Sequence, residues 1–369
     1  MINIFYFLIA VLVLAVMIFI HELGHYTAGR LLGFKIIDFS IGFGPALVKH
    51  KSKKTDITYA LRAIPLGGAC RFYGEEDDKI DDAVAFNSQK PWKRLIVVFA
   101  GPFMNFVLAY VLAVFMLTAF GTQQYRTYEN GEEAVVIVDL TSGGPAETAG
   151  VKVNDIIISV DDLDVENTHS TFEDKTTALS EKIGSSDHPG SVTLKLLRGD
   201  DIVEAEVNCT YSEEHQRYMM GITMGLEVVY VRTSFFKSFG DAGKFLVNIV
   251  VTTFNAIANG FKNGFHEGDV SGIVGTVAIT MNMASKGFYY VLVVMILISM
   301  SLGIMNLLPI LPMDGGHLLF DFIELIFRKP VPRKIQNVLS IIGIVLLVAL
   351  MIYATIGDIK GLFNGLFNF

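Results

Sequence analysis

The chain has 369 residues, of which 52% are hydrophobic and only 18% are charged, and its formal net charge at pH 7 is −8. This composition excludes a chain built only of ordinary soluble domains and is typical of a protein that crosses a membrane several times. The lipid bilayer is therefore an expected partner, and we expect no nucleic acid to bind.

The first apolar segment, residues 2–20, carries no charged residue and is long enough to cross the core of a bilayer. It has neither a basic start nor a small-residue cleavage site, so we expect it to be retained rather than removed as a signal peptide. The pattern predicts a first transmembrane helix within residues 1–33 that ends at Gly33.

This helix carries the motif His21-Glu22-Leu23-Gly24-His25. Two histidines four residues apart lie on one face of a helix, where neutral imidazoles can bind one Zn²⁺ beside a glutamate that acts as general base. Ionisable side chains inside an apolar helix are costly unless they are paired or bound to metal. The motif therefore predicts a hydrolytic metal site, with His21 and His25 as ligands and Glu22 as base, and coincidence is the less favoured alternative.

Residues 34–93 contain two β-prone runs, 41–48 and 57–68, separated by a polar turn at 51–56. This arrangement predicts a β-hairpin or small sheet at the membrane surface. One alternative is a simple folded loop. The functional interpretation is that an edge strand binds an extended substrate by strand addition. The residues expected to contact the substrate are Thr58, Tyr59, Ala60, Leu61 and Arg62.

Further apolar runs predict three more transmembrane helices, at 94–120, 288–317 and 338–357, followed by a tail at 358–369. Trp92, Lys93 and Arg94 are expected to anchor the second helix at the interface. Lysine and arginine are frequent in 34–93 and in the loop 318–337, which places both on the cytoplasmic side.

The segment 233–287 contains a weaker apolar run at 245–261, in which Asn248, Thr252, Asn255 and Asn259 form one polar stripe. The stripe favours an amphipathic helix that lies on the membrane and is joined by a linker to the next span, and a fifth span is the alternative.

The segment from Gly121 to Lys237 contains 21 Asp and Glu against 9 Lys and Arg, a net charge of 9 − 21 = −12. We expect it to be extracytoplasmic, with both chain termini on the same side. Its run Gly144-Pro145-Ala146, continuing to Ser159-Val160-Asp161, resembles a bacterial PDZ domain, which we place at residues 121–232. Such a domain binds extended chain ends by β-augmentation, or it only blocks access sterically.

A third metal ligand is expected from the end of the third apolar run, which reads Asn306-Leu-Leu-Pro309-Ile-Leu-Pro312-Met313-Asp314-Gly-Gly. The two prolines break the helix, which brings Asp314 near the depth of His25. Its carboxylate would be a third ligand that leaves the fourth position to water, as in catalytic zinc sites. The alternative is an ordinary turn where the chain leaves the membrane.

Together, the H-E-L-G-H motif, the N-L-L-P-I-L-P-M-D-G-G motif and the PDZ-like segment resemble the site-2 protease family of intramembrane zinc metalloproteases, most closely its bacterial regulator-of-sigma-E protease branch. The resemblance implies Zn²⁺ as cofactor, His21, His25 and Asp314 as its ligands, and Glu22 as the catalytic base. It also implies that Asn306 and Pro309 hold the substrate or the oxyanion.

The resemblance further implies cleavage within transmembrane segments of single-span proteins during regulated intramembrane proteolysis. The substrates would be anti-sigma factors or signal-peptide remnants that an extracytoplasmic protease has already trimmed. The location would be the bacterial inner membrane, with the active site near the cytoplasmic face. The alternatives are a catalytically silent membrane adaptor that uses the PDZ domain and an intramembrane metal transporter.

Overall fold

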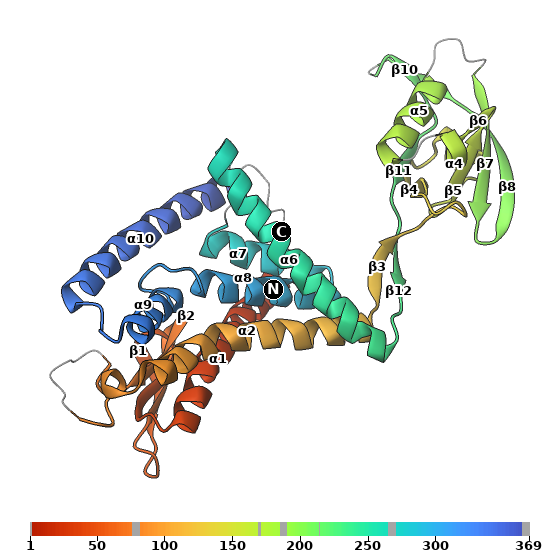
Figure 1. Ribbon diagram of the computed structural model, residues 1–369. Coiled ribbons are helices and arrows are strands. Elements are labelled where there is room, and N and C mark those ends of the chain that lie inside the picture. The colour runs from red at the N-terminus through yellow and green to blue at the C-terminus, as the bar shows by residue number, and fades with distance from the viewer. Residues whose placement is uncertain are drawn as a thin grey trace. The chain divides into compact units, whose positions relative to one another are not determined.

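The computed structural model describes residues 2–75, 82–168, 171–184, 190–213, 215–264 and 271–363 (Figure 1). These residues form two compact units. The membrane unit consists of Met1–Ala119 and Thr233–Phe369, and the inserted unit consists of Phe120–Arg232.

The membrane unit is built mainly of helices. They are α1 (Ile2–Leu32), the short 3₁₀ helix η1 (Phe86–Ser88), α2 (Pro91–Ala119), α6 (Phe235–Asn263), α7 (Ile273–Ser285), α8 (Phe288–Asn306), α9 (Asp314–Phe327) and α10 (Arg333–Phe363). Among the described residues, four helices are long and apolar enough to cross a membrane: α1, α2, α8 and α10. Each of these four overlaps one of the four predicted spans, and α6 is not one of them.

Several element boundaries differ from the expectations. The third span ends at Asn306 instead of reaching His317, because residues 307–313 are not helical. Most of the expected loop 318–337 belongs to α9 and α10, and the expected linker after α6 contains the helix α7. The first residues of the expected tail, up to Phe363, continue α10, while 364–369 lie outside the described residues.

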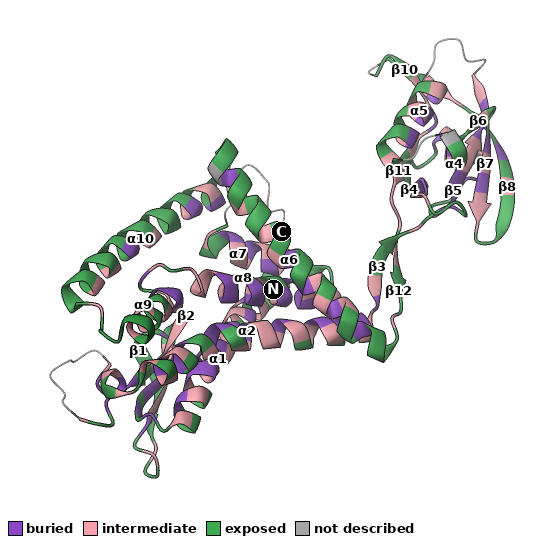
Figure 2. Cartoon of the chain, viewed as in Figure 1, coloured by how far each residue is buried: buried purple, intermediate pink, exposed green. Residues whose placement is uncertain are grey.

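Helix α2 packs against four other helices of the membrane unit, namely α1, α6, α8 and α9. Its contact with α1 is close at Gly24, where an added Cβ would lie 2.2 Å from the carbonyl oxygen of Ala100. The apolar window of α8 is 44% buried, whereas that of α10 is 11% buried (Figure 2). Helix α10 therefore presents most of its apolar surface outward, as a lipid-facing helix does.

Strands β1 (Ile36–Lys51) and β2 (Thr58–Phe72) form a sheet beside α1. Each strand bends and contributes two segments. Residues 38–41 pair antiparallel with 68–71 on one side and parallel with 58–61 on the other, and 48–51 pair antiparallel with 58–61. The sheet edges are therefore 48–51 and 68–72. Gly42, with φ +87°, lies at the bend of β1, where an added Cβ would be 2.5 Å from the Ile64 carbonyl oxygen.

This pairing corrects the expectation for the substrate strand. Thr58–Leu61 has a paired segment on each side, so it is an inner strand and has no free backbone edge to offer. The sequence pattern showed two β-prone runs but not that each would fold back as two segments.

The inserted unit is an α+β domain. Its strands are β3 (Thr122–Tyr125), β4 (Val136–Leu140), β5 (Ile156–Val160), β6 (Leu163–Asp164), β7 (Ser191–Arg198), β8 (Asp201–Asn208), β9 (Thr210–Ser212), β10 (Arg217–Met219), β11 (Ile222–Gly225) and β12 (Val228–Val231). Its helices are α3 (Pro145–Thr148), α4 (Val165–Thr168) and α5 (Phe172–Gly184). The main sheet has the order β11-β4-β5-β7-β8, with β6 paired to β5, and β3 and β12 form a separate two-stranded ribbon.

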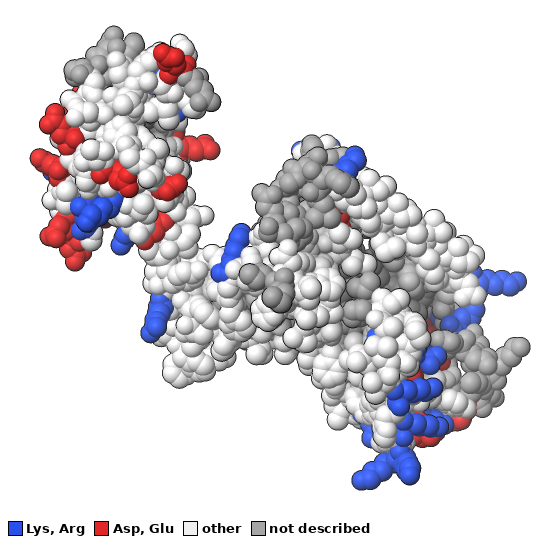
Figure 3. Space-filling view, turned by 180° about the vertical axis from the view of Figure 1, so that it is seen from behind, with Lys and Arg blue, Asp and Glu red and all other residues white. Residues whose placement is uncertain are grey.

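The core of the inserted unit joins the main sheet to α5 through fully buried apolar side chains such as Ile157, Leu179 and Leu194. Acidic side chains are spread over the surface of this unit (Figure 3). In the membrane unit, lysine and arginine side chains gather around the sheet of β1 and β2 (Figure 3). Each distribution agrees with the charge asymmetry of the sequence.

Candidate metal centre

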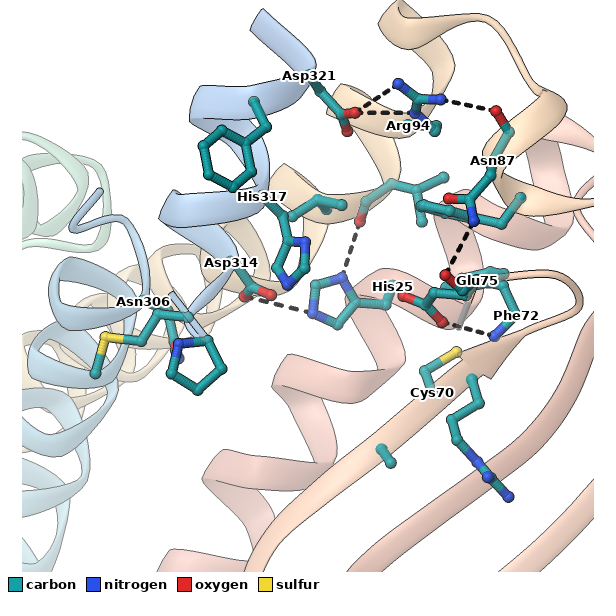
Figure 4. Close-up of a pocket in the computed structure, with 18 of the residues that line it drawn as sticks. His25, Cys70, Phe72, Glu75, Asn87, Arg94, Asn306, Asp314, His317 and Asp321 are labelled. Atoms are coloured by element: carbon teal, nitrogen blue, oxygen red, sulfur yellow. Dashed lines mark hydrogen bonds and ion pairs between the residues drawn. The ribbon is translucent and has the colours of Figure 1, made fainter. Parts of the chain in front are cut away.

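Three potential metal ligands converge from two helices that are far apart in the sequence. His21 and His25 lie on one face of α1, and Asp314 is the first residue of α9. The two Nε2 atoms are 3.2 Å apart, and Oδ2 of Asp314 lies 3.1 Å from Nε2 of His21 and 3.5 Å from Nε2 of His25. Figure 4 shows Asp314 directed toward His25 across the cavity.

The donor set and its surroundings fit a metal ion. Two imidazoles and one carboxylate form the ligand set of many catalytic zinc sites. Oδ2 of Asp314 is buried and has no hydrogen-bond partner. The two facing Nε2 atoms give it no donor, because an imidazole that binds metal through Nε2 carries no proton there. A metal ion between the three side chains would give this oxygen its missing partner.

Gly101 of α2 keeps the space between the ligands open. A Cβ at this position would lie 2.3 Å from Nε2 of His25 and 3.0 Å from Nε2 of His21. Any larger residue would therefore place a methyl group or more against the metal-binding nitrogen atoms. Gly101 therefore borders the candidate centre.

Backbone and side-chain groups of α2 orient both imidazoles. Nδ1 of His25 donates to the carbonyl oxygen of Val97 at 2.9 Å, so its Nε2 is free to bind metal. Nδ1 of His21 lies 3.0 Å from the amide nitrogen Nδ2 of Asn105, a side chain that is completely buried. Turning the amide over exchanges its oxygen and nitrogen, so that Oδ1, which otherwise has no partner, accepts from Nδ1–H of His21 and leaves Nε2 free to bind metal.

Glu22 lies beside the ligands and against the edge segment of β2. Its side chain is buried, and the backbone of Cys70 hydrogen-bonds its carboxylate. Gly68 makes this approach possible, since a Cβ there would be 2.7 Å from Cγ of Glu22. Burial, with a smaller contribution from the nearby Glu22, raises the pKa of the Cys70 thiol.

A cavity of about 1260 Å³ surrounds these groups. One part is lined by Glu22, the three ligands, Asn306 and the edge segment Gly67–Phe72. Another part is polar, with Asn87, Arg94, Asp321 and Glu324. Figure 4 shows His317, one turn after Asp314, directed toward the cavity. Burial raises the pKa of Asp321 to about 6, although the adjacent Arg94 opposes this shift.

The structure thus brings together five of the residues singled out in the sequence: His21, Glu22, His25, Asn306 and Asp314. Thr58–Arg62 and Pro309 are not among the described residues that line this cavity. Sequence reasoning missed the roles of Gly68, Gly101 and Asn105. An asparagine inside an apolar helix and a glycine beside a proline were visible signals, but both are equally typical of ordinary helix packing.

Comparison with known proteins supports this chemistry. The model of Peptidase family M50 matches residues 9–350. A protein of Campylobacter jejuni, described as a candidate zinc metalloprotease, is 30% identical over 96% of this chain and 93% of its own length. A protein of Fusobacterium nucleatum with the same description is 31% identical over 97% of this chain and 99% of its own length.

A solved structure was also matched, the PDZ domain of an SdrC-like protein from Listeria innocua, with 17% identity and a TM-score of 0.20 over 25% of this chain and 93% of that one. The family match extends over nearly the whole chain, and the relatives are described as metal-dependent proteases. The chain therefore belongs to peptidase family M50, the site-2 protease family of membrane metalloproteases.

Proposed function

We propose that the protein is an intramembrane zinc endopeptidase that hydrolyses peptide bonds within or near transmembrane segments of single-span membrane proteins. The observation that carries this proposal is that Asp314, at the start of α9, meets His21 and His25, which lie with Glu22 on a helix long and apolar enough to cross a membrane. A metal transporter would need further polar side chains along several spans. A protein that only binds partners does not need a buried glutamate beside three metal ligands, because burying a carboxylate costs free energy.

Zn²⁺ held by His21, His25 and Asp314 would act as a Lewis acid toward the attacking water and the scissile carbonyl. The carboxylate of Glu22 accepts the proton of that water and then delivers it to the nitrogen of the leaving amine. Asn306, on the last turn of α8, lines the same cavity and can donate a side-chain N–H to the carbonyl oxygen as negative charge develops.

The substrate must be extended before it can react, because a helical backbone engages its carbonyl groups in its own hydrogen bonds. The segment Gly67–Phe72 is a sheet edge, and it lines the cavity beside Glu22. We assign substrate binding by strand addition to this edge, in place of Thr58–Arg62, of which 58–61 form an inner strand.

Site-specific crosslinking tests this assignment. A photo-crosslinking residue at position 71, whose native arginine lines the cavity, should capture a single-span substrate in a Glu22→Gln background. The matched residue at position 59 should give only background, because Tyr59 lies on the inner strand and its hydroxyl is 2.9 Å from that of Tyr26. Stronger capture at 59 than at 71 would refute the reassignment.

The remaining parts of the proposal concern location and partners. The basic side chains around β1 and β2 favour a cytoplasmic position for this sheet, and the acidic inserted unit favours the opposite side of a bacterial inner membrane. We propose that the inserted unit is a PDZ domain, supported by its sequence run and by β11, an edge strand of its main sheet. Anti-sigma factors or signal-peptide remnants, trimmed first by an extracytoplasmic protease, are the proposed substrates.

Metal content tests the centre itself. Asp314→Ala should weaken Zn²⁺ binding by more than about a hundredfold, since loss of a direct ligand should exceed the 10–100-fold effect of outer partners. The dissociation constant is measured by chelator competition on the purified full chain. Asp56→Ala, which removes an exposed carboxylate paired with Lys51, is the control and should bind zinc normally. Unchanged zinc binding in Asp314→Ala would remove Asp314 from the site.

A further inference from the structure

The position of Asp314 is not set by the helix that precedes it. Helix α8 ends at Asn306, and residues 307–313, which include Pro309 and Pro312, are not helical. Asp314 is the first residue of α9, with Met313 at the N-cap position. The place of its carboxylate therefore depends on how α9 is held against the rest of the membrane unit.

Helix α2 carries the residues that orient the two histidines of α1. Val97, Gly101 and Asn105 follow one another at intervals of four residues and thus share one face of the helix. These are the residues that orient His25, leave space for the metal and contact His21. Arg94, three residues before Val97, continues this face toward the start of α2, and α9 packs against the same helix.

Arg94 connects this face of α2 directly to α9. Its side chain is only 7% exposed. Nε donates to Oδ1 of Asp321 at 2.9 Å, Nη2 donates to Oε2 of Glu324 at 2.5 Å, and Nη1 donates to the backbone oxygen of Asn87 at 3.0 Å. Figure 4 shows the guanidinium group between α9 and the segment that carries Asn87. An arginine expected at the membrane interface is therefore buried in an ionic network.

The two carboxylates lie on the same side of α9 as the proposed ligand. Asp321 and Glu324 follow Asp314 by seven and ten residues, which is about two and three turns. A guanidinium that binds both carboxylates restrains the helix more than one contact would, because its planar donors prescribe the direction of each bond.

We propose that Arg94 is a positioning residue that fixes α9 against α2 and thereby sets the separation between Asp314 and the two histidines. The inference rests on the proposed metal centre. On this view one face of α2 positions all three ligands: two through Val97 and Asn105, and the third through Arg94.

A local explanation competes with this one. Gly315 and Gly316 pack tightly on the preceding turn, where added Cβ atoms would lie 2.1 Å from the Leu308 carbonyl oxygen and 2.8 Å from the Leu311 side chain. If this turn alone positioned Asp314, Arg94 would contribute to stability only. Metal affinity separates the two explanations, because stability of the fold and the geometry of the ligands are measured independently.

The experiment uses the purified full chain in detergent, with Arg94→Gln and Arg94→Lys. Zinc dissociation constants are measured by chelator competition, the visible spectrum of the Co²⁺-loaded protein reports ligand geometry, and thermal unfolding of the metal-free protein reports stability. We expect zinc to bind about tenfold more weakly to Arg94→Gln, the lower end of the range for groups that act on ligands indirectly, with an altered Co²⁺ spectrum. The zinc affinity of Arg94→Lys should lie between those of the parent and Arg94→Gln. Lysine keeps the positive charge but lacks the planar guanidinium donors that bind two carboxylates at once.

Arg126→Gln is the matched control, since it removes an arginine–carboxylate pair with Glu227 in the inserted unit and should leave both metal measurements unchanged. If Arg94→Gln does not fold, Glu324→Gln, which keeps the pair of Arg94 with Asp321, is measured instead and should also weaken zinc binding. Variants with lower unfolding temperatures but parental zinc affinity and Co²⁺ spectrum would overturn the positioning role. A parent protein that bound no zinc would overturn the proposed metal centre as well.

Discussion

Glu22→Gln should lower the rate of peptide hydrolysis by about 10²–10⁴-fold, the usual contribution of a general base, while zinc binding is retained. Glutamine has the size of glutamate but cannot accept the proton of the attacking water. Because Glu22 is not one of the three converging ligands, the donor set of His21, His25 and Asp314 remains intact. The measurement is the cleavage rate of a single-span model substrate by full-length protein, with zinc content determined on the same sample.

The control for this variant is Glu206→Gln, which changes an exposed carboxylate on β8 and should cleave at the parental rate. Equal rates for Glu22→Gln and the parent protein would end the protease proposal. Loss of zinc together with activity would instead show that Glu22 contributes to the metal centre rather than acting as base alone.

Gly101→Ala should reduce zinc affinity by more than about a hundredfold, an effect comparable to the loss of a ligand. The new methyl group would lie 2.3 Å from Nε2 and 2.4 Å from Cε1 of His25, so the ring that should bind zinc could not keep its position. The atoms it meets first are the ends of two side chains, so the imidazoles can turn away. The turn would cost His25 its hydrogen bond to Val97, worth about 1 kcal/mol.

Zinc affinity and thermal unfolding of the metal-free protein together test this expectation. Gly243→Ala in α6 is the matched control, because an added Cβ there meets no atom within 4 Å and alanine favours a helix. It should bind zinc like the parent. Parental zinc affinity in Gly101→Ala would contradict the expectation that this position borders the metal site.

Local pattern was sufficient for those features whose physical cause lies within a short stretch of chain. Four uncharged or nearly uncharged runs predicted the four helices long and apolar enough to cross a membrane. The spacing of His21 and His25 predicted a shared helix face, and Pro309 and Pro312 predicted the break before Asp314. Each of these follows from residue chemistry at a separation of a few positions.

Pairing and burial between distant segments were not determined in this way. The sequence by itself determined the chemistry available to this protein, namely two imidazoles, a glutamate and an aspartate at the ends of apolar helices. Only the tertiary structure decided that 68–72, and not 58–62, is the sheet edge beside Glu22, and that Arg94 is buried against α9. The physical reason is that strand pairing and ion pairs between distant segments depend on how those segments pack in the folded protein. The residues next to a given position in the sequence do not determine this packing.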